Sequence, residues 1–496
     1  MSLHSLIPLS CIIILGSSWL IIAKKEAFVM RIFELLYPIR DSQGHTISGP
    51  SWKWPNGHTI DKFLHGRERS REWRVYGSVY RIWSCNIPEI VITTPEDVRA
   101  FHSDSDLHNK SASSNGGWFF HQLLGDCMGL TNGSRWKRLR SEFSHVFTYG
   151  EALHMSPSIS KYAHNYVRAM MPAIQAAEFT IHVSSTFMQF PFFCTADALY
   201  GPMTEDEKSK LWLIGQQSLA LMRYVLLGGI YRFRISQIFC SGATKELGAF
   251  QKEWSAFNNR MYQSRRSRSP TPPIVSAWKP VTEGKLLESE VLQTLSEMLF
   301  ANLDVSSHVL TWLVTLLAEN EDQQRKLRDE IRNKGVNKNT SLNDYCNSKD
   351  TFLRACYLES LRLRPFTVFS IPESSPSEKT LGGFRIPENT SVVVDALEIN
   401  VNNPFWGKDS QTFNPERFNN IKQADLRYNL FAFGFGTRKC LGQYFAEAMI
   451  KNFVIYLLDQ YELCLPPSER RNGEYKVDSS TWVPISNVKL VLAKLK

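Results

Sequence analysis

The fold of this chain is decided by ten residues, Phe433–Gly442, which read FGFGTRKCLG. Gly434 and Gly436 permit backbone conformations that a Cβ atom would forbid, so the stretch predicts a tight loop. Beyond Cys440, apolar residues recur at helical spacing as far as Asp459. The stretch therefore predicts a glycine-rich loop that presents one cysteine at the beginning of a helix.

Charge and position favour the ionised form of this cysteine. A thiol at the N-terminus of a helix faces unpaired backbone N–H groups and the positive end of the helix dipole. Arg438 and Lys439 add positive charge beside Cys440. These features favour a thiolate, which is the form that binds a metal. The alternative is a free cysteine that packs in the core without a metal.

Two further pairs of residues stand at helical spacing. Trp136 and Arg140 are four residues apart, and Glu359 and Arg362 are three apart, so each pair shares one face of a predicted helix. Taken alone, the first pair is typical of surface stacking, and the second of a surface ion pair worth under about 1 kcal/mol. The segment around Glu359 is too apolar for a fully solvated helix, however, which favours a buried ion pair.

A long apolar segment with helical periodicity, 291–317, carries an acidic residue at its centre. Its middle part, 301–307, reads ANLDVSS, and the acid is Asp304. An ionisable group inside an apolar helix is a candidate functional residue. The alternative is a core helix with an incidental aspartate.

The loop matches the pattern FxxGxRxCxG at every fixed position, namely Phe433, Gly436, Arg438, Cys440 and Gly442. This is the haem-ligand loop of the cytochrome P450 family, which the chain resembles from about residue 60 to its C-terminus. The resemblance implies the cytochrome P450 fold, mainly α with small β-sheets. It also implies haem b (iron protoporphyrin IX) as cofactor, with the cysteine thiolate of Cys440 as the axial iron ligand.

The same resemblance assigns roles to the other motifs. Trp136, Arg140 and Arg438 would bind the haem propionates, a task that suits the planar fork of arginine. Further haem contacts would come from Phe433, Gly436 and Ala301. The segment Phe413–Phe418 resembles the PERF segment of the family, which implies a buried structural triad that pins the cysteine loop and consists of Glu359, Arg362 and Arg417.

The central helix departs from the family pattern at two positions. Ala301 and Asp304 match it, but Asn302 replaces a glycine and Val305 replaces a threonine. The threonine hydroxyl normally supports proton delivery to bound dioxygen, and valine can neither donate nor accept a hydrogen bond. Asp304 is therefore expected to be the catalytic acid, with Ser306 or its neighbour Ser307 in place of the threonine, through a water molecule.

Substrate contacts follow from the resemblance alone. It points to Phe119, Phe120, Val368, Phe369 and Trp482, each of which is also compatible with ordinary core packing. The segment 211–230 is similarly open to two interpretations, because its apolar residues are typical of core packing and also of a lid that dips into a membrane.

The resemblance implies a monooxygenase that oxidises a small-molecule substrate with dioxygen, by hydroxylation or oxidative cyclisation. Electrons would come from NADPH through NADPH-cytochrome P450 reductase, docked on Lys137, Arg138 and Lys439. The sequence is similar to fungal enzymes of secondary metabolism that tailor cyclic dipeptides (diketopiperazines), as in epipolythiodioxopiperazine mycotoxin pathways. The alternatives are a haem-thiolate isomerase, dehydratase or peroxide-driven enzyme, and a non-catalytic haem-binding protein.

Three regions are expected: a membrane anchor at 1–25, a linker at 26–60 and the catalytic domain at 61–496. The stretch 6–23 carries no charge, and positive residues follow it from Lys24 onward. A cleaved signal peptide, the alternative, carries its positive charges before the apolar run. The order seen here favours a single-pass anchor in the endoplasmic reticulum membrane with the catalytic domain in the cytosol.

Composition agrees with an intracellular enzyme at a membrane. The chain has 496 residues, of which 43% are hydrophobic and 21% charged, enough to bury a large core. Nine cysteines, an odd number without paired spacing, favour a reducing compartment. The net charge of +9 suits membrane lipid and an acidic protein partner. No nucleic-acid motif accompanies it, so nucleic acid is not expected as a partner.

Local patterns also predict elements outside the motifs. Two strands are expected at 79–83 and 89–93, where β-branched and aromatic residues cluster. A helix is expected to begin at 94–97, with proline in its first turn. The residues Thr204–Glu207 form a capping box that predicts the beginning of another helix.

Overall fold

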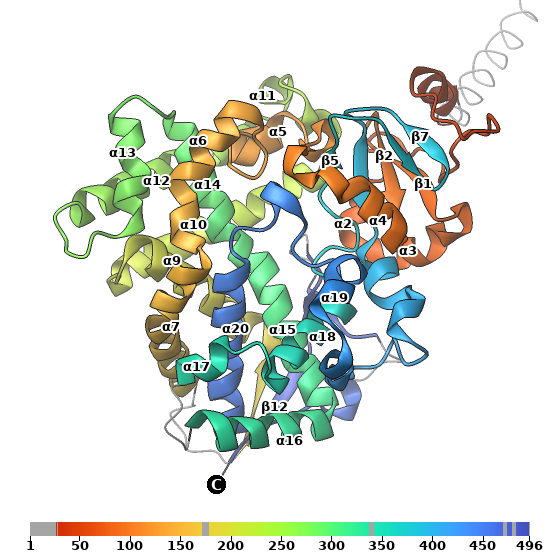
Figure 1. Cartoon of the computed structure of the whole chain (residues 1–496). Coiled ribbons are helices and arrows are strands. Elements are labelled where there is room, and N and C mark those ends of the chain that lie inside the picture. The colour runs from red at the N-terminus through yellow and green to blue at the C-terminus, as the bar shows by residue number, and fades with distance from the viewer. Residues whose placement is uncertain are drawn as a thin grey trace, which may run out of the picture.

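The apolar segment 291–317 lies within one continuous helix through the middle of the molecule (Figure 1). This central helix begins as α14 (Glu288–Ala301), passes through a π-helical turn (Asn302–Ser306) and continues as α15 (Ser307–Glu319). Every residue of α15 except Glu319 is buried. The segment is apolar on all sides because other elements surround it on all sides.

The structure is a computed structural model that describes Glu26 and residues 28–170, 178–336, 342–469, 474–478 and 483–495. The expected membrane anchor, 1–25, and the expected substrate residue Trp482 lie outside the described residues. Within them, one helix, Glu288–Glu319, has the length and composition to cross a membrane, but 78% of its apolar window is buried inside the fold. It is the central helix of the core.

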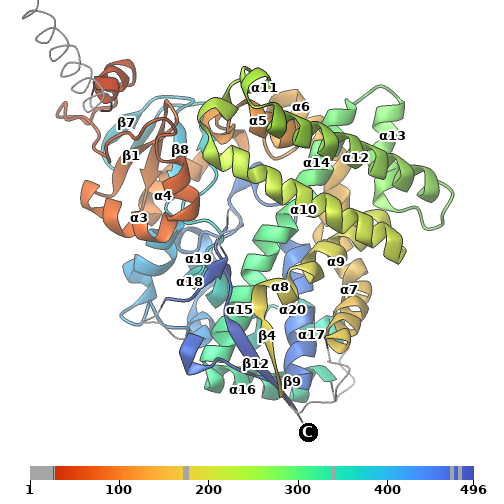
Figure 2. The same cartoon turned by 180° about the vertical axis from the view of Figure 1, so that it is seen from behind.

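Other helices pack around the central one, and Figure 2 shows α10 and α12 crossing on one side of it. The prediction of a mainly α fold with small β-sheets is confirmed. The helices are α2 (Thr59–Leu64), α3 (Gly66–Trp73), α4 (Pro95–Phe101), α5 (Trp118–Phe120), α6 (Gly133–Phe143), α7 (Tyr149–Ala169), α8 (Val183–Phe187), α9 (Gln189–Tyr200), α10 (Glu205–Leu227), α11 (Ser236–Phe239), α12 (Ser241–Arg265), α13 (Pro273–Thr282), α16 (Glu321–Glu330), α17 (Leu342–Asn347), α18 (Phe352–Leu363), α19 (Gln423–Asn429) and α20 (Gln443–Gln460).

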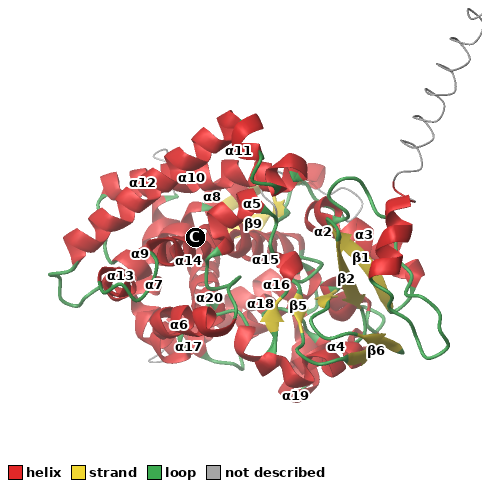
Figure 3. Cartoon of the chain, turned by 90° about the horizontal axis from the view of Figure 1, so that it is seen from above, coloured by secondary structure: helices red, strands yellow, loops and turns green. Residues whose placement is uncertain are grey.

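The largest sheet has the strand order β1-β2-β8-β5-β3. The two predicted strands are confirmed as β1 and β2, which pair antiparallel, and β8 joins β2 in parallel. Figure 3 shows β1 and β2 at one end of the molecule, away from α12 and α13. The strands are β1 (Val79–Ser84), β2 (Ile87–Ile92), β3 (Asn109–Lys110), β5 (Glu373–Ser374) and β8 (Ser391–Val394).

A second sheet, of order β4-β12-β9, joins segments that are far apart in sequence. Its central strand β12 pairs antiparallel with both neighbours. Two hairpin-like pairs complete the described strands. The bounds are β4 (Glu178–His182), β9 (Tyr461–Cys464) and β12 (Lys489–Lys494), with the pairs β6 (Lys379–Leu381) and β7 (Phe384–Ile386), and β10 (Val477–Asp478) and β11 (Ile485–Ser486).

Both predicted helix starts are confirmed by their caps. The Thr94 hydroxyl accepts from the Asp97 N–H at the start of α4. Thr204 and Glu207 form the reciprocal capping box of α10. The apolar segment 211–230 falls largely within α10 and is divided between core and surface, because some of its residues pack inward while others, such as Leu213, are exposed.

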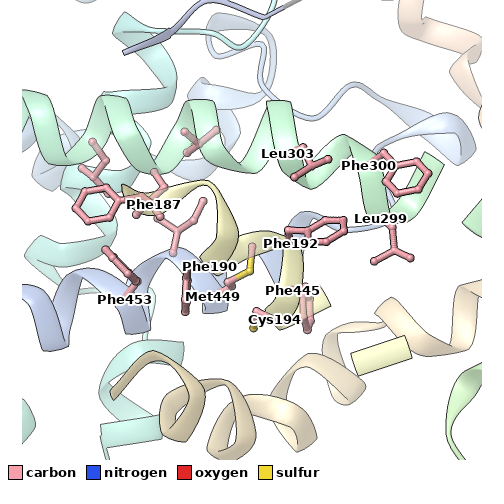
Figure 4. Packing of buried hydrophobic residues seen from close by; sticks show 14 of the residues in the cluster. Phe187, Phe190, Phe192, Cys194, Leu299, Phe300, Leu303, Phe445, Met449 and Phe453 are labelled. Carbon is pink, nitrogen blue, oxygen red and sulfur yellow. The ribbon is translucent and has the colours of Figure 1, made fainter. Parts of the chain in front are cut away.

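Contacts between aromatic rings hold four helices together in the core (Figure 4). Phe187 of α8 and Phe190 of α9 contact Phe453 of α20, with ring centroids 5.0 and 4.6 Å away. Phe192 stacks against Phe300 of α14. Large buried rings contribute strongly to core stability. The packing fixes α20, which begins just after Cys440, relative to the central helix.

Candidate active site

The cysteine loop is a tightly closed turn between a short 3-10 segment, Gly436–Arg438, and helix α20. The Cys440 N–H donates to the Phe433 carbonyl oxygen at 2.8 Å, which closes the loop. Gly434 and Gly436 have φ of 74° and 62°. A Cβ atom on Gly436 would lie 2.6 Å from the backbone of Ser105, so only glycine fits.

Two segments of the interior face open space instead of packed side chains. Cys440 is exposed although it lies between two ordered elements. Ala301, at the end of α14, is also exposed, whereas Leu299 and Leu303 on either side of it are fully buried. The charge of Glu297 on α14 reaches the Cys440 thiol and contributes to raising the pKa of that thiol. We call the space that the two segments border the cleft.

Desolvation, and not the helix dipole, dominates the protonation of Cys440, because protein surrounds the space that its exposed side chain faces. Desolvation by the surrounding protein raises the pKa of its thiol, while the Gly442 N–H and the charge of Arg140 lower it less strongly. The sequence indicated that the loop by itself favours the thiolate, and this is wrong for the protein alone, because desolvation is a tertiary effect. Coordination to a metal displaces the thiol proton.

A group of cations borders the cleft near α6. The Arg438 guanidinium lies 4.6 Å from the ring centre of Trp136 and donates to the carbonyl oxygens of Thr131 and Gly129 at 3.0 and 3.2 Å. Burial lowers the pKa of Arg438 to about 10, which still leaves it charged at neutral pH. Arg140 is half-buried and makes no ion pair or side-chain hydrogen bond within the described part of the chain.

This donor set fits haem. A soft sulfur ligand on a closed loop suits its iron. A half-buried cation without an anion is costly, and a propionate carboxylate would complete it. The exposed Ala301 leaves the opposite side of the cleft without a bulky side chain. A ring contact and mutual charge effects bring Cys440, Trp136, Arg140 and Arg438 together, and the exposed Ala301 stays the expected haem contact on α14.

The π-helical turn of the central helix is held by its own polar side chains. The Asn302 amide donates to the Met298 carbonyl oxygen at 2.6 Å and accepts from the Ser306 hydroxyl at 2.6 Å. The Ser307 hydroxyl donates to the Asn302 carbonyl oxygen at 3.0 Å. Asp304 is buried, with 3% of its surface exposed. Both serines are therefore engaged within the helix, and Asn302 is their common partner.

Glu359, Arg362 and Arg417 lie together in a buried network. Arg362 donates to both carboxylate oxygens of Glu359, at 2.6 and 2.8 Å, and Arg417 donates to Oε1 at 3.0 Å. The remaining Arg362 donors reach the carbonyl oxygens of Asn400 and Ser410. Glu359 and Arg362 are fully buried. The network ties α18 to the segment that leads into the cysteine loop.

The expected substrate residues that the structure describes are all buried. Phe119 packs against Tyr224 of α10, with ring centroids 5.2 Å apart. Phe369 packs against Trp73 at 5.5 Å. Phe120 and Val368 are 6% and 7% exposed. These contacts agree with ordinary core packing, so a substrate role for the four residues stays a prediction.

Two charged residues near the cleft were not singled out from the sequence. Glu297 on α14 accepts a hydrogen bond from the Gly129 N–H at 2.9 Å. Glu297 stands four residues before Ala301, so the two share one helix face, and this spacing is the signal in the sequence that could have identified Glu297. Lys110 pairs with Glu373 at 2.6 Å, and its charge lowers the pKa of Cys440. No sequence pattern marks Lys110, because its partner lies 263 residues away.

Comparison with known proteins agrees with this geometry. The cytochrome P450 family model matches residues 67–490. Cytochrome P450 monooxygenase hasH of Aspergillus fumigatus is 39% identical over 90% of this chain and 84% of its own length. Cytochrome P450 monooxygenase sirC of Leptosphaeria maculans is 39% identical over 93% and 90%. Cytochrome P450 monooxygenase gliC of Aspergillus fumigatus is 36% identical over 89% and 88%. This chain therefore belongs to the cytochrome P450 family of haem-dependent monooxygenases.

Proposed function

We propose that this monooxygenase holds haem b in the cleft, with Cys440 as the axial iron ligand. The observation that carries the proposal is the pairing of an exposed cysteine on a closed loop with an exposed alanine on a buried helix. Phe433 and Gly436 would support the ring from the loop side, and Ala301 would face it from α14. Bound haem supplies dioxygen activation, which the thiolate ligand promotes.

Arg140 and Arg438 would hold the two propionates, with Trp136 between α6 and the loop. Arg140 has no anionic partner in the described chain, and a propionate would pair with it directly. Arg438 is already oriented by the carbonyl groups of Thr131 and Gly129. Glu359, Arg362 and Arg417 would keep the loop in place without touching the cofactor.

Proton delivery in this chain would run from Asp304. Asp304 is buried in the π-helical turn, beside Val305, which cannot relay a proton. The Ser306 hydroxyl donates to Asn302, so it would serve as a relay only if that bond exchanges with water. A π-helical turn inside an α-helix is frequently found at functional sites.

The substrate class that we infer is a cyclic dipeptide or a related small cyclic amide of fungal secondary metabolism. Its support is the sequence resemblance to fungal oxidases that tailor such compounds, and the 36–39% identity to fungal monooxygenases over most of the chain. The relatives are named monooxygenases, so neither the isomerase, dehydratase and peroxide-driven alternatives nor a non-catalytic protein is favoured.

NADPH-cytochrome P450 reductase would dock behind the cysteine loop. A hollow of about 1370 Å³ lies on this side of the molecule, and Lys439 is among the residues that line it. Lys137 and Arg138 of α6 are exposed. Exposed cations complement an acidic partner and speed its association.

A location at the endoplasmic reticulum membrane, with the domain in the cytosol, agrees with an apolar surface around α11. Phe233, Ile238 and Phe239 are 59%, 75% and 68% exposed. Arg232 and Arg234 are interleaved with them, as expected at an anionic lipid surface. This apolar surface comes directly after α10 in the chain. The proposal therefore includes the interpretation that 211–230 forms a lid that dips into the membrane.

Labelled oxygen tests the reaction. Purified protein, reductase, NADPH and ¹⁸O₂ would be incubated with a cyclic dipeptide, and the product analysed by mass spectrometry. We expect one labelled oxygen atom in a hydroxylated product, and none when NADPH is omitted. Product that forms without reductant, or only with added peroxide, would contradict dioxygen-dependent turnover and favour the alternatives.

A further inference from the structure

Two histidines and a glutamate that the proposed function does not use lie together in the interior. His102 begins a 3-10 segment, His102–Leu107, and His108 follows its end. Strand β3 then pairs antiparallel with β5, and this register sets Lys110 opposite Glu373. One nitrogen of each imidazole and one oxygen of Glu373 lie within 4.8 Å of one another. The fold thus gathers three groups of the kinds that bind transition metals.

Several polar atoms of this cluster have no partner, although all three side chains are more than nine-tenths buried. Among the described residues, neither ring nitrogen of His102 makes a hydrogen bond, and the same holds for Nδ1 of His108 and Oε2 of Glu373. Buried polar atoms in folded proteins are nearly always satisfied, because an unmade bond costs the full desolvation of the atom. Four such atoms in one cluster point to a ligand that completes them.

His108 is oriented as a metal ligand. Its Nε2 lies 3.0 Å from Asp104 Oδ1, and because a carboxylate only accepts, Nε2 carries the proton. The lone pair of the neutral ring is then on Nδ1, which lies 3.5 Å from Glu373 Oε2. Metal-binding histidines commonly donate their other N–H to a carboxylate in this way. Two ligands of a tetrahedral zinc ion lie about 3.4 Å apart, so His108 and Glu373 already have the required separation.

The other two ligands are in the state that a metal requires. Lys110 pairs with Oε1 of Glu373 at 2.6 Å, which leaves Oε2 for the cluster. Desolvation lowers the pKa of His102 to about 4, so its imidazole is neutral at pH 7. Neutral imidazole and ionised carboxylate are the forms that bind a metal.

A small cavity adjoins the cluster and limits which ion fits. Its volume is about 20 Å³, and His102, Glu373 and Gly434 are among the residues that line it. That volume suits one ion with a single water molecule. Zinc with three protein ligands needs one further ligand, and a water molecule can provide it. Six-coordinate iron(II) on two histidines and a carboxylate would need three more ligands, for which the cavity has no room.

We propose that His102, His108 and Glu373 bind a zinc ion, which braces the segment His102–Leu107 and strand β5 against the cysteine loop. The His102 ring lies 4.7 Å from the ring of Phe435 in that loop, between centroids. Gly434 of the same loop lines the cavity. The ion therefore joins two segments that are distant in sequence at the place where both meet the loop. This site goes beyond the proposed function and depends on neither the substrate nor the redox partner.

Zinc binding to the full-length, haem-loaded protein tests the site. The protein would be treated with a chelator and dialysed against buffered zinc, and its zinc content measured by elemental analysis. We expect one zinc ion per chain. His102→Phe should weaken zinc binding about 100-fold or more, because it removes a ligand. This variant keeps an aromatic ring beside Phe101 and Phe435 and loses no hydrogen bond, so it should fold and keep its haem.

Two further variants complete the test. His154→Ala is the matched control, because His154 is an exposed histidine on α7, and it should bind zinc as the wild type does. Glu373→Gln keeps the side-chain size and removes the charge, so it should weaken zinc binding about 10-fold or more. A wild type that binds no zinc would overturn the site. So would His102→Phe and Glu373→Gln if both bind zinc as tightly as the wild type.

X-ray absorption at the zinc edge identifies the ligands, and the haem iron does not interfere because its edge lies at a different energy. We expect nitrogen and oxygen neighbours at about 2.0–2.1 Å and no sulfur neighbour at about 2.3 Å. A sulfur neighbour would place the ion on cysteine and overturn the assignment to His102, His108 and Glu373.

The bracing role has a separate readout. The His108 N–H donates to the Ser105 carbonyl oxygen at 3.3 Å within the segment that zinc would hold. Added zinc should slow hydrogen exchange of this amide about 10-fold or more in the wild type, because the ion binds only the closed segment. It should have no effect in His102→Phe. Unchanged exchange in a wild type that binds zinc would overturn the bracing role.

Discussion

Two groups of buried charge in this molecule are built in opposite ways. In the closed network, Glu359, Arg362 and Arg417, the carboxylate pairs with both guanidinium groups, and backbone carbonyls take further arginine donors. In the open cluster, Arg140, Arg438 and Cys440, Arg140 lacks an anion among the described residues and the thiol faces the cleft. The closed network requires nothing more, whereas the open cluster requires a ligand.

The difference has an energetic basis. Charges removed from water are tolerated when every donor and acceptor finds a partner, as in the closed network. An unpaired, half-buried cation costs free energy that folding alone does not offset. An unpaired charge of this kind is expected at a functional site, because a bound ligand supplies the missing partner. The comparison thus supports a structural role for the closed network and the proposed cofactor-binding role for the open cluster.

The strongest test of the comparison is Cys440→Ser. Without the sulfur, monooxygenase activity should be abolished, and the red-shifted carbon monoxide band of the reduced protein, which depends on a thiolate ligand, should disappear. The free energy of unfolding of the haem-free protein should stay within about 0.5 kcal/mol of the wild type, because the side chain is exposed. A variant that keeps the thiolate band would refute Cys440 as the ligand.

The next largest effect should come from Arg362→Ala in the closed network. It leaves the buried Glu359 carboxylate with one arginine fewer, and should lower the free energy of unfolding by about 3–5 kcal/mol even without haem. Urea denaturation of the haem-free protein measures this. Arg354→Ala on the same helix α18 is the control, because its 3.4 Å pair with Glu447 lies near the surface and should contribute under about 1 kcal/mol. Equal losses in both variants would refute the special role of the closed network.

In the open cluster, Arg140→Ala should weaken haem binding without lowering the free energy of unfolding, in contrast to Arg362→Ala. Haem affinity should fall about 10-fold, the effect of losing one hydrogen bond between charged groups. The haem-free protein should be no less stable, because the change removes an unpaired half-buried charge. Haem titration and denaturation of the same samples measure both quantities. Arg138→Ala, an exposed neighbour on α6, should leave both unchanged. A loss of stability in Arg140→Ala would show that Arg140 is structural.

The two groups also differ in how much of them the sequence could predict. In the closed network, Glu359 and Arg362 share one helical turn, and the structure pairs them as expected; Arg417, 58 residues away from Glu359, was expected only from the family resemblance. The cysteine loop also rests on short-range spacing and closes as expected. Glu297, by contrast, accepts a hydrogen bond from Gly129, which is 168 residues away, and no local sequence pattern predicts that contact. The expectation of a lowered thiol pKa for Cys440 is wrong for the same reason, because the desolvation that raises this pKa depends on segments far away in sequence.

The smallest expected effect concerns Val305, where the central helix departs from the family pattern. Val305→Thr adds a hydroxyl of nearly the same volume in the π-helical turn beside the buried Asp304. If proton delivery limits the enzyme, the fraction of NADPH that yields product should rise, by well under the roughly 100-fold that a positioned proton donor can contribute. Haem content should not change, because no residue of the open cluster is altered.

Val305→Ala is the control for this variant, because it changes the volume of the side chain without adding a hydroxyl. NADPH consumption, peroxide release and product formation would be measured together in the three proteins. A rise in coupling in the threonine variant alone would assign the effect to the hydroxyl and to Asp304 as the acid behind it. An equal rise in both variants would assign the effect to the changed side-chain volume at position 305 and would contradict a role for the added hydroxyl.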